Sequence, residues 1–299
     1  MKSRRPVLAV LRGSCARTAR SATGSAAAGT ALALLLGFSA NAPADEGMWT
    51  LDNFPTATVE ARYGVTIDKP WLDSVQASIA RLDGGCTGSF VSPDGLVLTN
   101  NHCVWGCVRN LSSATENLSE AGFLARNRDQ ERQCPGARIS VLVDTEEITD
   151  QVEAATRGKA DSEANDARKA ALTRLEKACE ARTDGALACE SVNLYRGGQY
   201  FLYRYKRYDD VRLAFAPELA IAAFGGDPDN FNFPRFCLDM AFLRAYEDGQ
   251  PASTPTYLRW RAEGPREGEA VFVTGHPGST ERMLTVADLE HLRNVERPY

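Results

Sequence analysis

The residue types that could do chemistry in this sequence gather around one histidine, His102. Two short apolar runs joined by the turn Ser92-Pro-Asp-Gly95 precede it, with Cys86 before them and Cys103 directly after the histidine. A fixed imidazole can take a proton from a hydroxyl and return it, because its pKa lies near neutral pH. A disulfide between Cys86 and Cys103 would close a short loop and hold this base in place. The block predicts nucleophilic catalysis with His102 as the general base.

An orienting carboxylate is the second requirement, because it fixes the tautomer of the imidazole. Asp227 and Asp229 lie in a Gly-Gly-Asp-Pro-Asp-Asn turn, whereas Asp239 stands at the entrance of the apolar run 240–246. Spacing leaves all three open. We favour Asp239, since a carboxylate at the mouth of a strand is better placed to be buried and oriented than one in a Gly-Pro turn.

The nucleophile is the third requirement. Chymotrypsin-like serine proteases present it in a Gly-rich loop of their second barrel, typically Gly-Asx-Ser-Gly, and the sequence contains no such loop. Ser279 follows Gly278, but too little chain remains after it to finish a second barrel. We expect the serine and the oxyanion hole to lie beyond this chain, and Ser279 is the weaker alternative.

Zinc binding is the competing interpretation of the histidine block. His102, Cys103 and Cys107 could donate to the metal. A closed zinc site needs four ligands, however, and the thiols of an exported chain oxidise. The sequence therefore predicts no metal and no other cofactor.

Residues 1–44 resemble a secretion signal, with six basic residues, no acid, the apolar run Ala26–Phe38 and a small-x-small site ending at Ala44. An uncleaved membrane anchor is the alternative. Cleavage predicts a periplasmic or secreted protein without stable membrane insertion. It would leave 28 of the 34 basic residues against 39 acidic ones, a balance that argues against a nucleic-acid partner.

Seven of the eight cysteines lie after residue 44. An exported chain keeps disulfides, so pairs such as Cys107 with Cys134 and Cys179 with Cys189 are plausible, although spacing does not fix connectivity. The odd number leaves one thiol free, and Cys237 is the candidate.

The remaining patterns predict a mainly β fold with an inserted helix. Strands are expected at 139–143, 240–246 and 270–274, and the alternating runs 200–208 and 211–215 predict a hairpin. The Ala-, Glu-, Lys- and Arg-rich stretch 152–181 predicts one amphipathic helix, or two broken near Gly158. Residues 283–294 look helical.

Taken together, the sequence resembles the bacterial dipeptidyl-peptidase 7 and 11 family of serine exopeptidases. Three blocks carry the resemblance, with a weaker fourth at Gly275-His-Pro-Gly-Ser-Thr280. They are Asp45-Glu-Gly-Met-Trp49, Gly84-Gly-Cys-Thr-Gly-Ser-Phe90 with Asn101-His-Cys103, and Phe224-Gly-Gly-Asp-Pro-Asp-Asn230 through Asp239.

The resemblance implies a chymotrypsin-like double β-barrel, incomplete in this chain, with a helical domain inserted between its halves. Residues 1–44 would be the signal peptide, 45–280 the N-terminal part of the barrel domain and 281–299 the start of the helical domain. His102 would be the base and Asp239 its carboxylate. Asn230, with Phe231 beside it, would bind the free amino group of the substrate.

Three positions depart from the family pattern. Asn101 replaces a second, non-catalytic histidine, Phe231 replaces a tryptophan beside the amine site, and Phe236 replaces a histidine. The departures bear on the shape of the amine pocket and on strict dipeptide release.

The sequence therefore predicts the N-terminal part of a longer serine dipeptidyl-peptidase that acts on peptides with a free N-terminus and forms a homodimer when complete. This part alone would be inactive. A non-catalytic binding module on a protease-like barrel and a chymotrypsin-like endopeptidase are the alternatives.

Overall fold

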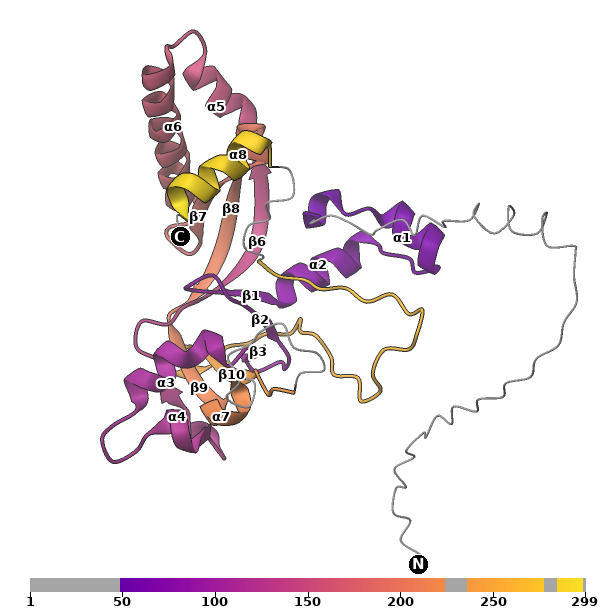
Figure 1. Cartoon of the computed structure of the whole chain (residues 1–299), viewed down its shortest axis with the longest axis vertical. Coiled ribbons are helices and arrows are strands. Elements are labelled where there is room, and N and C mark those ends of the chain that lie inside the picture. The colour runs from indigo at the N-terminus through magenta and orange to yellow at the C-terminus, as the bar shows by residue number, and fades with distance from the viewer. Residues whose placement is uncertain (1–48, 224–235, 277–283, 298–299) are drawn as a thin grey trace, which may run out of the picture. The chain divides into compact units, whose positions relative to one another are not determined.

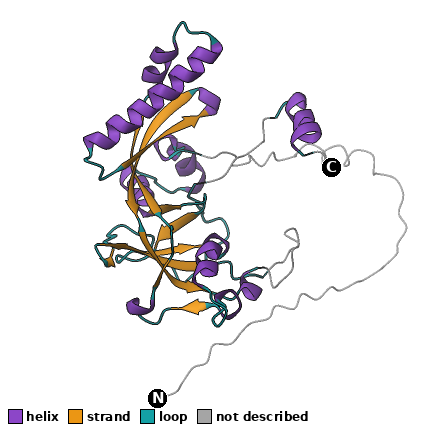
Figure 2. Ribbon diagram, turned by 90° about the vertical axis from the view of Figure 1, so that its left-hand side faces the viewer, coloured by secondary structure: helices purple, strands orange, loops and turns teal. Residues whose placement is uncertain are grey.

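The structure is a computed structural model that describes residues 49–223, 236–276 and 284–297. The strands in these ranges form one eleven-stranded sheet in the order β4-β9-β10-β3-β2-β1-β6-β8-β7, with β5 on β9 and β11 on β10. Figure 1 labels most of these strands, among them the long β6 and β8. Every pair is antiparallel. Helices accompany the strands (Figure 2). The mainly β prediction is confirmed, and in the described residues the path runs openly from β4 to β7.

The strands range from two to ten residues. They are β1 Ile79–Leu82, β2 Thr87–Phe90, β3 Leu96–Thr99, β4 Phe123–Leu124, β5 Arg132–Gln133, β6 Ile139–Glu147, β7 Ala188–Leu194, β8 Gln199–Tyr208, β9 Asp210–Ala216, β10 Ala241–Glu247 and β11 Gln250–Pro251.

The described helices are mostly short. They are α1 Thr56–Tyr63, α2 Lys69–Ser78, α3 Trp105–Leu111, α4 Leu118–Ala121, α5 Thr149–Thr156, α6 Asp161–Arg182, α7 Leu219–Ala222 and α8 Val286–His291, which continues into the π-helical turn Leu292–Glu296. None of the helices in these ranges is both long and apolar enough to cross a membrane.

The turn between β2 and β3 is built by its own side chains. The Ser92 hydroxyl accepts a hydrogen bond from the Leu96 amide at 3.2 Å and contacts the Asp94 carboxylate. Gly95 has a φ of 74°, and a Cβ there would lie 2.6 Å from the Ala245 carbonyl oxygen. Only glycine fits this approach, so the turn sets the position of β3 and of the histidine after it.

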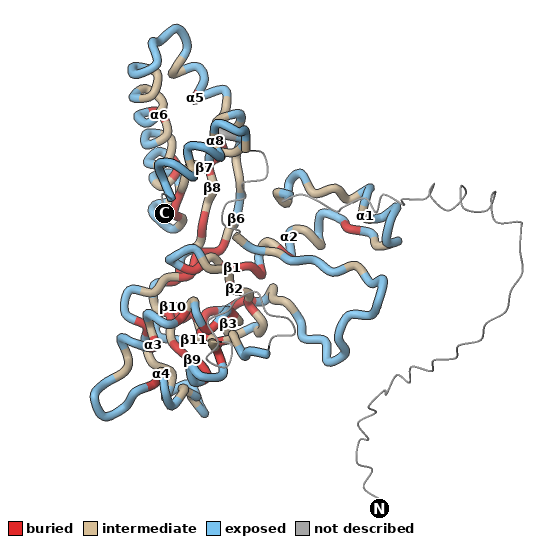
Figure 3. The backbone as a smooth tube through the Cα atoms, in the orientation of Figure 1, coloured by how far each residue is buried: buried red, intermediate tan, exposed pale blue. Residues whose placement is uncertain are grey.

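Two separate clusters of buried side chains stabilise the fold. The site core lies among β1, β2, β3, β9, β10, the start of β6 and the end of β8, and includes Ala80, Leu82, Phe90, Val97, Ile139, Val141, Tyr208, Leu213 and Leu243. The hairpin core packs α5 and α6 against β7 and β8, and consists of Ile148, Val152, Cys179, Cys189, Tyr200 and Leu202. Figure 3 shows buried residues concentrated on the strands, with α5 and α6 largely outside them.

The amphipathic stretch 152–181 forms two helices, α5 and α6, which confirms the alternative of two helices broken near Gly158. Gly158 lies in the connection with a φ of 75°. Cys179 of α6 is joined to Cys189 of β7, which fixes the end of the helical hairpin on the sheet. Strands at 139–143 and 240–246 are also present, as β6 and β10.

The predicted hairpin between 200–208 and 211–215 is wrong, although both strands exist. β8 pairs with β6 and β7, whereas β9 pairs with β10, β4 and β5. One residue, Asp209, separates the two strands. A tight hairpin needs a loop of about two residues, so the chain passes from one pairing partner to the next instead of folding back.

The predicted strand 270–274 is also wrong. This stretch has no strand assignment, and Val273 is fully exposed. Phe272 packs its ring against Trp71 with centroids 5.1 Å apart. The apolar run signals a strand, but no described strand offers a partner for its backbone.

Candidate active site

His102 lies at the point where β3 gives way to a short helix. β3 is a central strand, paired with β2 on one side and β10 on the other. His102 opens the 3-10 turn His102–Val104, which runs directly into α3. The side chain of His102 is 52% exposed, so strand pairing fixes the backbone while the ring faces solvent.

Asp239 meets this histidine from the neighbouring strand. Ala241, at the start of β10, pairs with Thr99 at the end of β3, which brings the residues beyond both strand ends together. One carboxylate oxygen of Asp239 lies 2.7 Å from Nδ1 of His102, and the other accepts the backbone N–H of His102 at 3.0 Å. The carboxylate is 20% exposed.

This geometry assigns the proton on the ring. An ionised carboxylate only accepts hydrogen bonds, so Nδ1 of His102 is the N–H donor to Asp239. The other nitrogen, Nε2, then carries a lone pair. The arrangement is that of a general base whose tautomer is fixed by a carboxylate.

The two asparagines before the histidine tie its turn to different neighbours: Asn100 to Asp239, and Asn101 to Trp105 and Pro217. The Asn100 amide donates to the Asp239 backbone oxygen at 3.0 Å and to its carboxylate at 3.2 Å. Asn101 is 2% exposed; it accepts from the indole N–H of Trp105 at 2.7 Å and donates to the Pro217 oxygen at 3.4 Å. Sequence reasoning missed Asn100 and Trp105, because their partners are not visible from spacing.

The part of the chain that the structure describes contains three disulfides: Cys86–Cys103, Cys107–Cys134 and Cys179–Cys189. Among the described residues Cys237 is the free, exposed thiol.

Cys86, His102 and Cys103 bring possible ligand atoms within 4.8 Å of one another. The sulfurs of Cys86 and Cys103 are joined to each other, however, and that of Cys107 to Cys134. Zinc binds thiolates, so this donor set does not fit the metal.

Several residues considered from the sequence lie outside the described ranges. These are Asp227, Asp229, Asn230, Phe231 and Ser279. Their roles therefore stay predictions. Asp239 is the one of the three candidate aspartates within the described residues, and it contacts His102.

A second group of titratable side chains surrounds His276. Burial, together with the positive charge of Arg81, lowers the pKa of His276, and Glu190 acts in the opposite direction. Arg81 forms an ion pair with Glu190 at 2.6 Å, and its guanidinium lies 4.3 Å from the centre of the Tyr205 ring. Burial raises the pKa of Tyr205 to about 12. This group packs β1 against β7 and β8 and contains no nucleophile–base pair.

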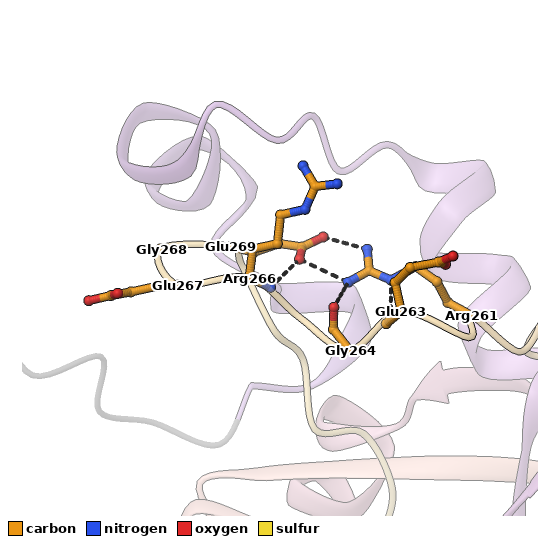
Figure 4. A pocket seen from close by; sticks show the side chains of 7 residues that line it. All are labelled: Arg261, Glu263, Gly264, Arg266, Glu267, Gly268 and Glu269. Atoms are coloured by element: carbon orange, nitrogen blue, oxygen red, sulfur yellow. Dashed lines mark hydrogen bonds and ion pairs between the residues drawn. The ribbon is translucent and has the colours of Figure 1, made fainter. Parts of the chain in front are cut away.

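A cavity of about 680 Å³ lies within the loop 261–269 (Figure 4). Arg261 forms an ion pair with Glu269 at 2.6 Å and donates to the Gly264 oxygen at 3.0 Å. All the lining residues belong to this one loop. The hollow is therefore the inside of a loop closed by an ion pair, and it is built from residues other than His102 and Asp239.

Comparison with known proteins places this arrangement among peptidases. The model of the peptidase S46 family matches residues 44–299. Dipeptidyl-peptidase 7 of Porphyromonas gingivalis is 32% identical over 288 residues, 89% of this chain and 40% of that protein. The Asp/Glu-specific dipeptidyl-peptidase of Shewanella putrefaciens is 34% identical over 276 residues, 83% of this chain and 36% of that protein.

Solved structures agree with these relatives. Porphyromonas endodontalis DPP11 in complex with the dipeptide Arg-Glu superposes with a TM-score of 0.62 and 25% identity, over 75% of this chain and 36% of that one. Its complex with the dipeptide Arg-Asp gives 0.62 and 27%. The chain thus spans about 40% of the length of the curated relatives it matches.

Proposed function

This chain belongs to the peptidase S46 family, and from that premise we propose that it is the N-terminal part of a serine-type dipeptidyl-peptidase. His102 is the general base in this proposal and Asp239 the carboxylate that orients it. The observation that carries it is the 2.7 Å contact between Nδ1 of His102 and Asp239, with Asp239 also holding the His102 backbone N–H. The names of the relatives support dipeptide release.

In the proposed reaction a serine hydroxyl attacks the carbonyl carbon of the peptide bond after the second residue. Its proton passes to Nε2 of His102, which then gives it to the leaving amine. Water repeats the sequence on the acyl-enzyme and releases the dipeptide. Asp239 stabilises the imidazolium that forms in each half and keeps the ring in the productive tautomer.

The remaining parts of the proposal rest on the similarity to relatives that are longer than this chain. The sheet would be the first part of a chymotrypsin-like double β-barrel, and the serine and the oxyanion hole would come from polypeptide after residue 299. Asn230 and Phe231 would bind the substrate's amino group. Residues 1–44 would direct export to the periplasm or the medium, and the complete protein would act as a homodimer on peptides.

The test uses the complete polypeptide encoded by the gene and a hexapeptide offered with a free or an acetylated amino group. We expect dipeptides from the free peptide and no cleavage of the acetylated one, read by mass spectrometry. Equal cleavage of both would mean an endopeptidase.

The 299-residue chain is assayed beside the complete polypeptide. Loss of a triad nucleophile lowers turnover by about a million-fold, so this chain should show no hydrolysis. Turnover by the 299-residue chain would contradict the proposal and point to Ser279 as the nucleophile.

A further inference from the structure

A small cavity of about 160 Å³ is lined by Asn101, the residue before the candidate base, and by Trp105, whose ring packs against that base. Its walls are mostly apolar and come from α3, from α4 and from the residues before and within α7. The apolar wall is formed by the side chains of Trp105, Val108, Pro217 and Leu219, and Asn101 also lines the cavity. A cavity of about 150 Å³ accommodates a benzene-sized group. The space therefore suits one branched aliphatic or aromatic side chain.

Trp105 belongs both to this cavity and to the catalytic arrangement. Its ring meets the imidazole of His102 edge to face, with centroids 6.3 Å apart, and it also lines the cavity. The indole is fixed by its hydrogen bond to the buried Asn101. It remains 42% exposed, so a ligand can reach it.

The chemistry of the base indicates which part of a substrate comes here. Nε2 of His102 must reach the nitrogen of the leaving amine to return the proton. The first residue after the scissile bond carries that nitrogen, so it lies against the imidazole and the groups packed on it. On this chain the group packed edge to face on the imidazole is Trp105.

We propose that the cavity lined by Trp105 and Val108 is a subsite for the leaving peptide, which takes an apolar side chain on the first residue after the scissile bond. This inference rests on the proposed function. The inference adds to that function a side-chain preference for the first residue after the scissile bond, which belongs to the leaving peptide and not to the released dipeptide.

Arg109 adds a charge preference to the same subsite. It lines the cavity, is exposed, and has no ion pair with any residue in the described ranges. When the leaving group is a single amino acid, its carboxylate lies one residue from the cleaved bond. Arg109 then favours the free acid over the amide, by a few-fold as for an exposed ion pair.

The first experiment needs no turnover. The 299-residue chain is titrated with leucinamide and with glycinamide while the indole N–H signals are followed by NMR; Trp105→Phe assigns the Trp105 signal, and Trp260, which is 65% exposed, is the internal control. We expect leucinamide to shift the Trp105 signal and to leave Trp260 unchanged. A Trp105 signal that responds equally to both amides overturns the subsite.

The second experiment uses the complete polypeptide and free-amine peptides that differ only in leucine or glycine after the cleaved bond. We expect kcat/KM to favour leucine by about tenfold, and Trp105→Ala to remove that preference while Trp260→Ala keeps it. Arg109→Gln should abolish the acid-over-amide preference for tripeptides. Cleavage with no leucine preference overturns the subsite alone. A leucinamide response without any cleavage shows that the cavity binds an apolar side chain, but it contradicts the proposed function and with it the assignment to the leaving peptide.

Discussion

The two cores of this molecule share one strand but stabilise different parts of the structure. β8 runs through both, since Tyr208 belongs to the site core and Leu202 to the hairpin core. Ile139 at the start of β6 belongs to the site core, whereas Ile148, directly after the end of β6, belongs to the hairpin core. The site core supports the β3 end that presents His102. The hairpin core fixes only α5 and α6 on the sheet. The comparison indicates that the candidate site is supported by one part of the sheet, and that the other part carries the α5–α6 insertion.

The disulfides follow the same division. Cys86–Cys103 and Cys107–Cys134 span 17 and 27 residues and tie the histidine turn and α3 to the site core. Cys179–Cys189 spans 10 residues and joins α6 to β7 inside the hairpin core. The first two disulfides thus position the histidine turn and α3, whereas the third stabilises packing within the hairpin core.

The largest expected effect is a loss of kcat with little loss of stability, which would distinguish the candidate site from both cores. Asp239→Asn in the complete polypeptide should lower kcat by about ten-thousand-fold, because an amide at this position favours the wrong tautomer of His102. The free energy of unfolding should change far less than the activity, since asparagine has the same shape as aspartate and its side-chain oxygen can still accept the His102 backbone N–H. Peptide hydrolysis and thermal unfolding measure the two quantities, and the exposed Asp129→Asn is the matched control.

An activity loss below about tenfold for Asp239→Asn would show that the contact with His102 is structural.

Removing one disulfide from each region tests whether the site core and the hairpin core are separable. Replacing Cys86 and Cys103, or Cys179 and Cys189, by serine should lower the free energy of unfolding by about 3 kcal/mol in either case. Only the first pair should also lower kcat, because it lies beside the base. Denaturant unfolding and peptide hydrolysis test this, and an equal loss of kcat in both double variants would mean that the two regions are not separable.

Single truncations in each core should show whether the regions open separately. Val97, in the site core, and Val152, in the hairpin core, are 0% and 1% exposed. Val97→Ala and Val152→Ala should each cost about 2 kcal/mol. Hydrogen exchange should rise throughout the chain for Val97→Ala but only in α5, α6 and β7 for Val152→Ala.

The same exchange pattern in both variants would indicate a single cooperative unit instead.

The smallest expected effect is a pH dependence from His276. Its pKa is lowered in the fold, first by burial and then by Arg81, so below about pH 6.5 the unfolded chain binds more protons than the folded one. Its contribution to stability is complete above that pH and is lost as the pH falls through the folded pKa. His276→Asn should flatten this part of the stability profile, and an unchanged profile would contradict the assignment.

Sequence alone predicted the parts of the site that depend on local pattern. His102 was identifiable from its turn, strand and cysteines, and Asp239 from its place before an apolar run. Asn100 and Trp105 could not be found in this way, because what they do depends on partners that only the paired strands and the fold bring close. The β8–β9 error has the same origin: strand character is local, but the choice of partner strand is not.

The stretch 270–274 is a case in which local pattern predicts a strand that is not formed. Its apolar run fits a strand, yet a strand exists only when its backbone is paired. Phe272 packs with Phe54 and Trp71 instead. Local pattern therefore overestimated order here.

Gly275 and His276 bring the chain back against β2. A Cβ on Gly275 would lie 2.6 Å from the Thr87 side chain, and the His276 N–H donates to the Thr87 hydroxyl at 2.8 Å. Thr87 directly follows Cys86, which is bonded to the neighbour of His102. Gly275 and His276 are thus anchored one residue away from the disulfide that holds the histidine turn, and any side chain at position 275 would push this contact apart.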